Sequence, residues 1–325
     1  MAASSFPTSP GDPIADRRLA FARGLAGAGD FAAAAEVLAQ ALEIAPDWAA
    51  GWLLLGEWRE RAGDLAEALA AYREAHARDP DDGLGAGLRI AVLDSETPDA
   101  MPAAYVRTLF DDYAPRFESA LTQRLGYVAP KLIAASLARH RERRYATVID
   151  LGCGTGLMGE LVREHTDILV GVDLSERMLE RAGRKAVYDR LVAADAIDFL
   201  SGEPDSSADL IVAADMVPYV GSLVALFGSV ARVLAGGGVF AFSCERHDGE
   251  GFVLGEHLRY RHSAGLLAEA AAEAGLSLLT AEPAVLRREA GAGVAGLVCE
   301  LVRPADIMPL TPRPAGRRGR LAKAA

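Results

Sequence analysis

Hydrophobic and polar positions follow two different patterns along the chain, and the pattern changes near residue 146. Before this point apolar residues recur every three or four positions, the spacing of amphipathic helices. After it, helical stretches separate the first five of seven short apolar runs, which predicts a mostly parallel sheet covered on both faces. The last two runs, with no long helix between them, predict an antiparallel pair at one edge. The predicted strands are 147–151, 168–172, 191–194, 209–213, 238–243, 277–285 and 296–302.

The helical first part repeats itself. Gly29 recurs as Gly63 and Pro46 recurs as Pro80, both with an offset of 34 residues, and the second copy opens with the pattern W-x-x-L-G at Trp52. Period and residue types resemble the tetratricopeptide repeat, a pair of antiparallel helices. Two repeats are fewer than such an array usually needs, so we expect a helix near 84–93 to cap the stack. This module is expected to bind a protein partner or to mediate self-association.

A stretch of turn formers and acids, DSETPDAMP, separates the repeats from the α/β part. The fold class that follows is an α/β, Rossmann-like sheet of seven strands, mostly parallel with an antiparallel edge, preceded by an all-α module. The expected divisions are a disordered N-terminus at 1–13, repeats at 14–93, a linker at 94–102, the α/β domain at 103–303 and a basic disordered tail at 304–325.

Composition and charge narrow the classes of partner and ligand that we expect the chain to bind. The net charge of −11 gives little affinity for phosphates, so a nucleic-acid partner is not expected. No uninterrupted apolar run is long enough to span a membrane, and we expect no membrane partner. Three scattered cysteines, Cys153, Cys244 and Cys299, form no metal-binding pair and no disulfide framework. No metal is therefore expected, and the chain fits the reducing cytoplasm.

A glycine loop follows the first predicted strand in the sequence VIDLGCGTGLMG. Residues 154–159 fit the dinucleotide pattern G-x-G-x-x-G, which alone is a weak signal. The same loop also fits D-x-G-x-G-x-G, which begins at Asp150. A dinucleotide brings a pyrophosphate, which prefers backbone N–H groups to a carboxylate. A cationic ligand gains from a carboxylate there, so the Asp favours a positively charged guest.

Three more acids stand at successive strand ends. Asp173 follows the second strand and can accept hydrogen bonds from ribose hydroxyls, although this position suits NAD equally well. Asp195 follows the third strand, where it can accept from an adenine amino group while the N–H of Ala196 meets a ring nitrogen. Asp215 ends the fourth strand. Four acids in this arrangement favour S-adenosylmethionine, which is positive at its ammonium and sulfonium groups.

At this point the chain resembles the class I S-adenosylmethionine-dependent methyltransferases. DLGCGTG is similar to their first motif, the acids at 173 and 195 match the second and third, and the resemblance runs from about Tyr105 to Arg303. FDDYAPRFESAL, DLGCGTG and RYRHS together resemble a bacterial family in which tetratricopeptide repeats precede such a domain. The resemblance implies a fold and a cofactor but fixes no substrate.

The residues expected to bind S-adenosylmethionine come from the glycine loop, the strand ends and the segment before the first strand. Met178 either packs on the adenine or belongs to the core, and Tyr113 and Arg116 either contact the cofactor from a lid or pack on a helix face. Cys153 is expected to serve through its small size. The full set is Asp150, Gly152, Cys153, Gly154, Gly156, Asp173, Leu174, Met178, Asp195, Ala196, Asp215, Met216, Tyr113 and Arg116.

Methyl transfer mainly requires alignment, and a general base only when the acceptor must lose a proton. The candidates are His262, His247 and Tyr219. The fourth strand ends in DMVPY, which lacks the Pro-Pro motif of enzymes that methylate nucleobase amino groups. We therefore expect a small organic acceptor. The alternatives are a protein substrate recruited by the repeats, a protein-binding adaptor with a cofactor-bound or degenerate methyltransferase domain, and an NAD oxidoreductase.

Overall fold

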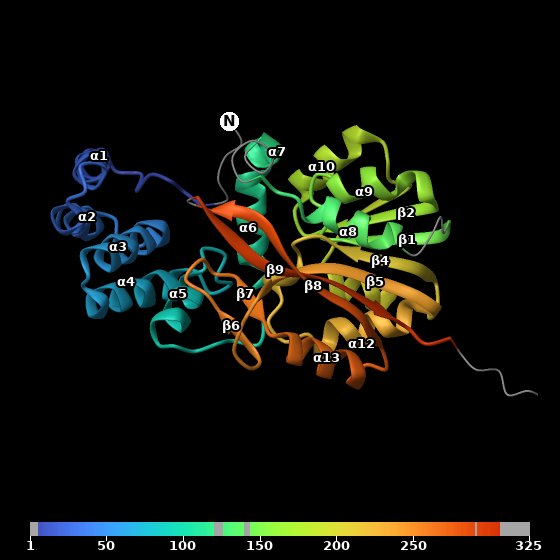
Figure 1. The fold of residues 1–325 in the computed structure, drawn as a ribbon. Helices are drawn as coiled ribbons and strands as arrows, with labels where there is room; N and C mark the ends of the chain where they lie inside the picture. The colour runs from blue at the N-terminus through green and yellow to red at the C-terminus, as the bar shows by residue number, and fades with distance from the viewer. Residues whose placement is uncertain (1–5, 120–125, 140–143, 290, 306–325) are drawn as a thin grey trace, which may run out of the picture.

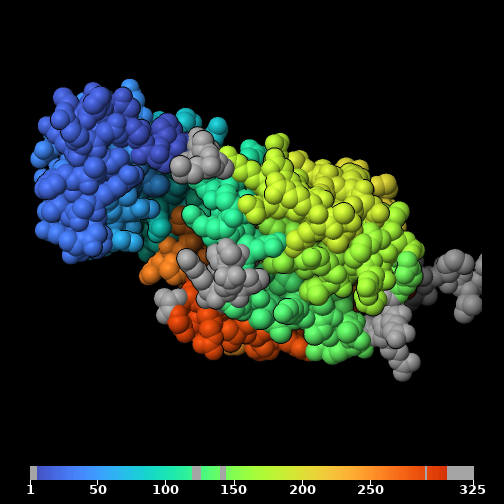
Figure 2. Space-filling view, turned by 90° about the horizontal axis from the view of Figure 1, so that it is seen from above, coloured from blue at the N-terminus to red at the C-terminus, as the bar shows by residue number. Residues whose placement is uncertain are grey.

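The computed structural model describes residues 6–119, 126–139, 144–289 and 291–305. Within them the molecule is elongated, with a helical lobe at one end and an α/β domain at the other (Figures 1 and 2). Most of the tail predicted at 304–325 lies outside the described residues.

The helical lobe consists of two helix pairs and one further helix, which we call the helical module. Small residues let the helices approach closely: Ala34, Ala41 and Ala68 are fully buried, and a side chain at Gly56 would collide with the ring of Tyr72. The helix predicted at 84–93 is present. The bounds are α1 (Pro13–Gly27), α2 (Phe31–Ile44), α3 (Ala49–Ala62), α4 (Leu65–Arg78) and α5 (Ala86–Leu93).

Part of the N-terminal segment that was predicted to be disordered contacts the helical module. The backbone oxygen of Pro7 accepts a hydrogen bond of 2.7 Å from Trp48 Nε1. The Asp12 carboxylate caps α1 by accepting from the N–H groups of Ile14 and Ala15. The segment 6–12 is therefore held by a buried tryptophan and a helix cap, which composition alone did not reveal.

In the described residues between the linker and the sheet, four helical elements are present. The chain is helical from Ala103 to Ser119, where it is divided into three elements, and again from Ala129. The bounds are α6 (Ala103–Tyr113), η1 (Ala114–Arg116), α7 (Phe117–Ser119) and α8 (Ala129–Ala138).

The sheet contains all seven predicted strands, but it has nine in total. The additional strands β6 and β7 have three residues each and form a hairpin beside the end of β5. Strands of this length are too short to show a periodic pattern in the sequence. Strands 3-2-1-4-5 are parallel in that order, and β9 runs antiparallel between β5 and β8. The bounds are β1 (Tyr145–Leu151), β2 (Thr166–Asp173), β3 (Arg190–Ala193), β4 (Ala208–Ala213), β5 (Leu234–Arg246), β6 (Phe252–Leu254), β7 (Tyr260–His262), β8 (Ser277–Glu289) and β9 (Ala292–Val302).

Helices cover both faces of the sheet, as the alternating pattern predicted. On one face α8 and α9 bury Ile133 and Met158 against the strands, and on the other α11, α12 and α13 bury Phe199, Phe227 and Leu267. In the described part of the chain, no helix combines the length and apolarity needed to cross a bilayer. The remaining elements are α9 (Leu157–Val162), η3 (Arg163–His165), α10 (Glu176–Lys185), α11 (Ala196–Gly202), η4 (Val217–Tyr219), α12 (Val224–Val233) and α13 (Ala264–Glu273).

Candidate functional site

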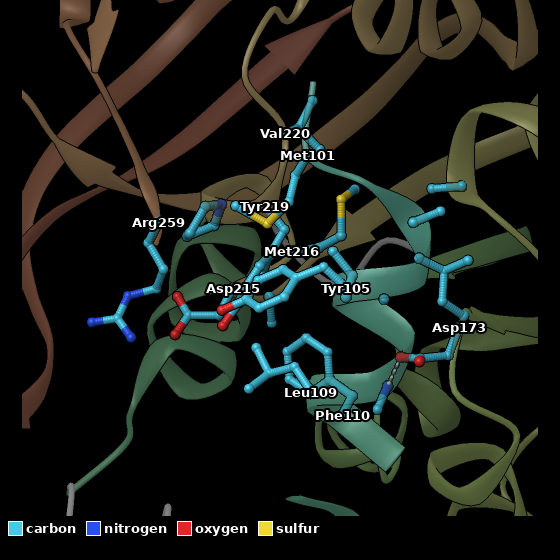
Figure 3. Close-up of a pocket in the computed structure, with 18 of the residues that line it drawn as sticks. Met101, Tyr105, Leu109, Phe110, Asp173, Asp215, Met216, Tyr219, Val220 and Arg259 are labelled. Carbon is cyan, nitrogen blue, oxygen red and sulfur yellow. Dashed lines mark hydrogen bonds between the residues drawn. The ribbon is translucent and has the colours of Figure 1, made fainter. Parts of the chain in front are cut away.

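A pocket of about 500 Å³ opens where the carboxyl ends of β1, β2, β3 and β4 meet (Figure 3). This is the place where open α/β sheets bind ligands. Helix α6 and the linker residue Met101 cover it. Ten of the predicted site residues line it, namely Gly152, Gly154, Asp173, Leu174, Asp195, Ala196, Asp215, Met216, Tyr113 and Tyr219.

The glycine loop forms the floor of the pocket beside β2. Gly152, Gly154 and Gly156 have φ angles of 64°, 54° and 90°, a region that other residues rarely adopt. A Cβ on Gly152 would also lie 2.8 Å from the side chain of Met216. The N–H of Cys153 donates to Val172 O at 2.9 Å, which ties the loop to β2. Conformation and close approach therefore both require glycine here.

Asp173 lies at one end of the pocket (Figure 3) and joins the glycine loop to α10. Its Oδ2 accepts from the N–H of Gly154 at 2.8 Å, and its Oδ1 accepts from the N–H of Ser175 at 2.8 Å. Burial raises the pKa of Asp173 to about 6, although these two N–H groups oppose the shift. Each oxygen keeps a lone pair that a ligand hydroxyl can use.

Asp195 and Ala196 line the pocket at the start of α11. Asp195 caps this helix, because its Oδ1 accepts from the N–H of Ile197 at 2.8 Å. Its other carboxylate oxygen makes no hydrogen bond to a described residue. The arrangement leaves an acceptor on the pocket wall that could receive an amino group.

Asp150 differs from the expectation, because it lies under the glycine loop and does not line the pocket. It is fully buried, and its Oδ2 accepts from the Tyr188 hydroxyl at 2.7 Å. A side chain on Gly159, the last glycine of the loop motif, would collide with that hydroxyl. Burial raises the pKa of Asp150 to about 7. Asp150 therefore supports the loop from below, and its Oδ1 has no partner among the described residues.

Four further predicted cofactor residues also lie outside the pocket lining. Cys153 and Gly156 take part in the fold of the loop, and the N–H of Gly156 donates to Cys153 O at 2.8 Å. Met178 is fully buried in α10, in agreement with the core alternative. Arg116 is exposed, and its guanidinium lies 5.6 Å from the centre of the Tyr113 ring. Of the two residues expected to belong to a lid, Tyr113 therefore lines the pocket and Arg116 does not.

The two histidines predicted to be catalytic are also absent from the lining. His262 is fully buried in β7, its Nε2 lies 2.9 Å from Gly221 O, and its ring stacks on Phe252. Burial lowers the pKa of His262. His247 follows β5, with its backbone N–H bonded to His262 O. The histidine that lines the pocket is His257, in the turn between β6 and β7, and the sequence pattern gave no sign of it.

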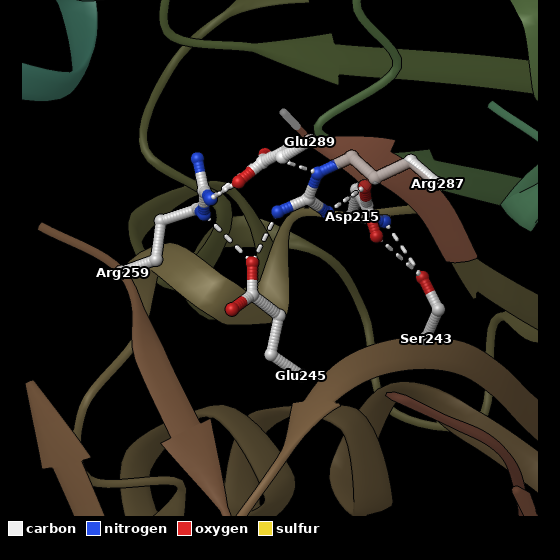
Figure 4. Close-up of polar contacts among 6 residues, drawn as sticks. All are labelled: Asp215, Ser243, Glu245, Arg259, Arg287 and Glu289. Atoms are coloured by element: carbon white, nitrogen blue, oxygen red, sulfur yellow. Dashed lines mark hydrogen bonds and ion pairs between the residues drawn. The ribbon is translucent and has the colours of Figure 1, made fainter. Parts of the chain in front are cut away.

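A network of buried and half-buried charges forms the wall opposite Asp173 (Figures 3 and 4). Arg287 pairs with Asp215 at 2.9 Å, with Glu289 at 2.8 Å, and with Glu245. Arg259 pairs with Glu245 and with Glu289, both at 2.6 Å. The attraction of its carboxylate partners keeps the pKa of Arg287 above its usual value despite burial. All but Glu245 line the pocket.

Aromatic rings connect the two charged ends of the pocket. Phe110 of α6 meets Tyr219 edge-on with 5.1 Å between ring centres, and it lies 6.3 Å from Phe117. Phe117 in turn contacts Tyr113 at 5.5 Å. With Met101 and Leu109 these rings give the pocket an apolar middle.

Comparisons with known proteins agree with this geometry. Residues 149–242 match the family model of a methyltransferase domain. A ubiquinone biosynthesis O-methyltransferase of Idiomarina loihiensis is 30% identical over 115 residues, 33% of this chain and 46% of that protein. A trans-aconitate 2-methyltransferase of Acidovorax ebreus is 33% identical over 127 residues, 38% of this chain and 48% of that protein. The chain thus spans about half the length of the curated relatives it matches.

Among solved structures, the cyclase SpnF is similar with a TM-score of 0.53 at 17% identity, over 64% of this chain and 98% of that chain. This likeness concerns the fold alone, because one fold can carry different reactions. The family match identifies a methyltransferase domain at residues 149–242, and the relatives that resemble this part of the chain are methyltransferases. The α/β domain is thus similar to the class I S-adenosylmethionine-dependent methyltransferases.

Proposed function

We propose that the chain is a methyltransferase that transfers a methyl group from S-adenosylmethionine to a small organic acceptor. The observation that best supports this proposal is that the carboxylate of Asp173 accepts a hydrogen bond from the N–H of Gly154 inside the glycine loop. A negative charge at that point suits a ligand with ribose hydroxyls and positive charge.

The same observation disfavours NAD. A pyrophosphate needs free N–H groups at the glycine loop. Here the N–H groups of Cys153, Gly154 and Gly156 already donate to oxygens of the protein. The residues present fit S-adenosylmethionine instead, with Asp173 for the ribose hydroxyls, Asp195 and Ala196 for the adenine, and the wall near Asp215 for the reacting end. These residue roles are part of the proposal.

When bound, S-adenosylmethionine supplies a methyl group whose bond to sulfur breaks as the acceptor atom bonds to the carbon. The chain contributes alignment, which is worth about 7–11 kcal/mol in well-oriented reactions. Residues of helix α6 and Met101 line one side of the pocket. Tyr219 and Asp215 line the reacting end, and burial raises the pKa of Asp215. A raised pKa makes its carboxylate a better proton acceptor at Oδ1 or Oδ2 than an exposed aspartate.

The test is ligand-induced stabilisation of the whole chain. S-adenosylhomocysteine at a hundred times its dissociation constant should stabilise the fold by about 2.7 kcal/mol, and NAD should have no effect. Asp173→Ala should abolish the shift in melting temperature. Asp205→Ala is the matched control, because the Asp205 side chain is 75% exposed and lies outside the pocket. Stabilisation by NAD, or a full response of Asp173→Ala, would contradict the proposal.

For the helical module we propose tetratricopeptide-like repeats that bind a protein partner or a second copy of the chain. The proposal rests on the 34-residue offset in the sequence and on the two helix pairs followed by α5. A protein substrate recruited by the repeats is the runner-up for the acceptor. If the chain is instead a protein-binding adaptor, the Asp173→Ala variant should lose the cofactor but still bind its protein partner. A pull-down with the full chain would test this.

A further inference from the structure

We propose that the network of Asp215, Glu245, Arg259, Arg287 and Glu289 is the acceptor subsite, and that it selects a flat, apolar molecule whose polar group donates a hydrogen bond through O–H or N–H. The inference rests on the proposed function, since it takes the opposite end of the pocket as the cofactor end. It names the chemical class of the acceptor and excludes molecules with several carboxylates.

The shape and polarity of the pocket support a flat acceptor. The rings of Phe110 and Tyr219 stand between the charged network and the rest of the pocket (Figure 3). Tyr105 and Tyr127 also line this region, and Met101 closes it from the linker. Aromatic rings favour stacked or edge-on contact with another ring. An aromatic or similarly planar molecule can therefore contact these rings better than a compact polar one.

The charges of the pocket disfavour an anionic acceptor. Four carboxylates, those of Asp173, Asp195, Asp215 and Glu289, line it against the two guanidinium groups of Arg259 and Arg287. S-adenosylmethionine carries one carboxylate, one ammonium and one sulfonium, and so adds a single positive charge. The occupied pocket would keep a surplus of negative charge, which repels a molecule with several carboxylates.

Both arginines are already paired with carboxylates of the protein. Arg287 donates to three carboxylates and Arg259 to two, and both share Glu245 and Glu289. An incoming carboxylate would have to share these guanidinium groups with carboxylates of the protein or displace one of them, and a displaced carboxylate would lose its hydrogen bonds. The lone pairs of the carboxylates, in contrast, can still accept from an O–H or N–H group.

Asp215 is the residue placed to receive that group. Its φ of 56° is rare for a residue other than glycine, and such strain gathers at functional sites. Arg287 and the hydroxyl of Ser243 hold its two oxygens, at 2.9 Å and 3.1 Å. Its side chain keeps 18% exposure, and Asp215 lines the pocket. The carboxylate is thus fixed in orientation and still open to a ligand.

The experiment measures binding to the full chain saturated with S-adenosylhomocysteine. The flat probes are 2-naphthol and tryptamine, and the carboxylate probes are trans-aconitate and citrate, each titrated by calorimetry and by saturation-transfer NMR. The decisive variant is Asp215→Asn, because asparagine has nearly the same shape and tolerates a positive φ. Glu289→Gln is the second variant. Asp248→Asn is the control, since Asp248 is 80% exposed and outside the pocket.

We expect both flat probes to bind and neither carboxylate probe to do so. Asp215→Asn should weaken the flat probes about tenfold, the difference between a charged and a neutral hydrogen bond. The proposal is overturned if a carboxylate probe binds as tightly as the flat ones, if no flat probe binds, or if Asp215→Asn and Glu289→Gln both leave their affinity unchanged. Absence of S-adenosylhomocysteine binding to the unmodified chain is a separate result, which would refute the proposed function itself.

Discussion

At the scale of single residues, Asp150 is a buried carboxyl whose ionisation opposes folding. Burial raises the pKa of Asp150 from 3.8 to about 7. Between these values the folded protein keeps a proton that the unfolded chain has released, so this group makes stability fall as pH rises through that window. Asp150→Asn removes the ionisation and keeps an acceptor for Tyr188. Its gain in melting temperature should be larger at pH 8 than at pH 5.

The control for this prediction is Asp205→Asn, at an exposed carboxyl. Its effect on melting temperature should be small and nearly the same at both pH values. Equal gains for Asp150→Asn at pH 5 and pH 8 would show that the pKa of Asp150 in the folded protein is not raised into this range.

Residue-level prediction succeeded where the chemistry is local in sequence. Asp173 and Asp195 each follow directly on an apolar strand, so their place at the top of the sheet could be derived from the pattern. Arg287 and Glu289 lie more than seventy residues beyond Asp215, on an antiparallel edge strand with an irregular register. Only the pairing of β8 with β9 brings them to the pocket, and nothing near them in sequence indicates it.

At the scale of elements, three segments that are far apart in sequence meet at Gly221 and shape the pocket. The N–H of Ser222 donates to Asp99 O of the linker at 2.8 Å, and His262 Nε2 of β7 lies 2.9 Å from Gly221 O. A Cβ on Gly221 would collide with Asp99 O. Gly221→Ala should therefore push the linker away and lower the free energy of unfolding by about 1–3 kcal/mol.

Chemical denaturation would check this, with Gly202→Ala as the comparison, because a Cβ on Gly202 meets no atom within 4 Å. Both variants add one methyl group near a pocket element. An equal change in unfolding free energy for the two would mean that the linker is not packed on the η4 loop.

Element-level prediction worked for strands with long apolar runs and failed for short ones. β1, β2, β4 and β5 were predicted because burial on both faces demands nearly continuous apolar residues. β3, β8 and β9 are less buried but also carry apolar runs. The β6–β7 hairpin has three residues per strand, and its residues His262 and Tyr260 are buried by contacts with the linker and η4. We predicted His262 as a candidate base because it lies in the segment RYRHS of the resembling family. Its burial depends on distant elements, which the sequence pattern does not show.

At the scale of the whole molecule, the helical module is packed onto the wall of the pocket and is not a separate appendage. Leu88 of α5 shares a buried cluster with Met101 of the linker and with Leu254, Leu258 and Tyr260 of the hairpin. Arg89 also donates to Glu256 O at 3.0 Å. The same hairpin carries His257 and Arg259, so the module supports residues that line the pocket.

This packing predicts that a cavity in α5 loosens the hairpin as well. Leu88 and Leu38 are 2% and 0% exposed, and truncation of either to alanine should cost about 2–5 kcal/mol. Leu38 belongs to the core shared by α1, α2 and α3 and does not touch the hairpin cluster. In hydrogen exchange on the full chain, Leu88→Ala should therefore speed exchange at 252–262, whereas Leu38→Ala should speed it only within the helical module. If exchange at 252–262 is the same in both variants, the module is not mechanically linked to the pocket, and a partner bound to the repeats would have no direct route to the acceptor subsite.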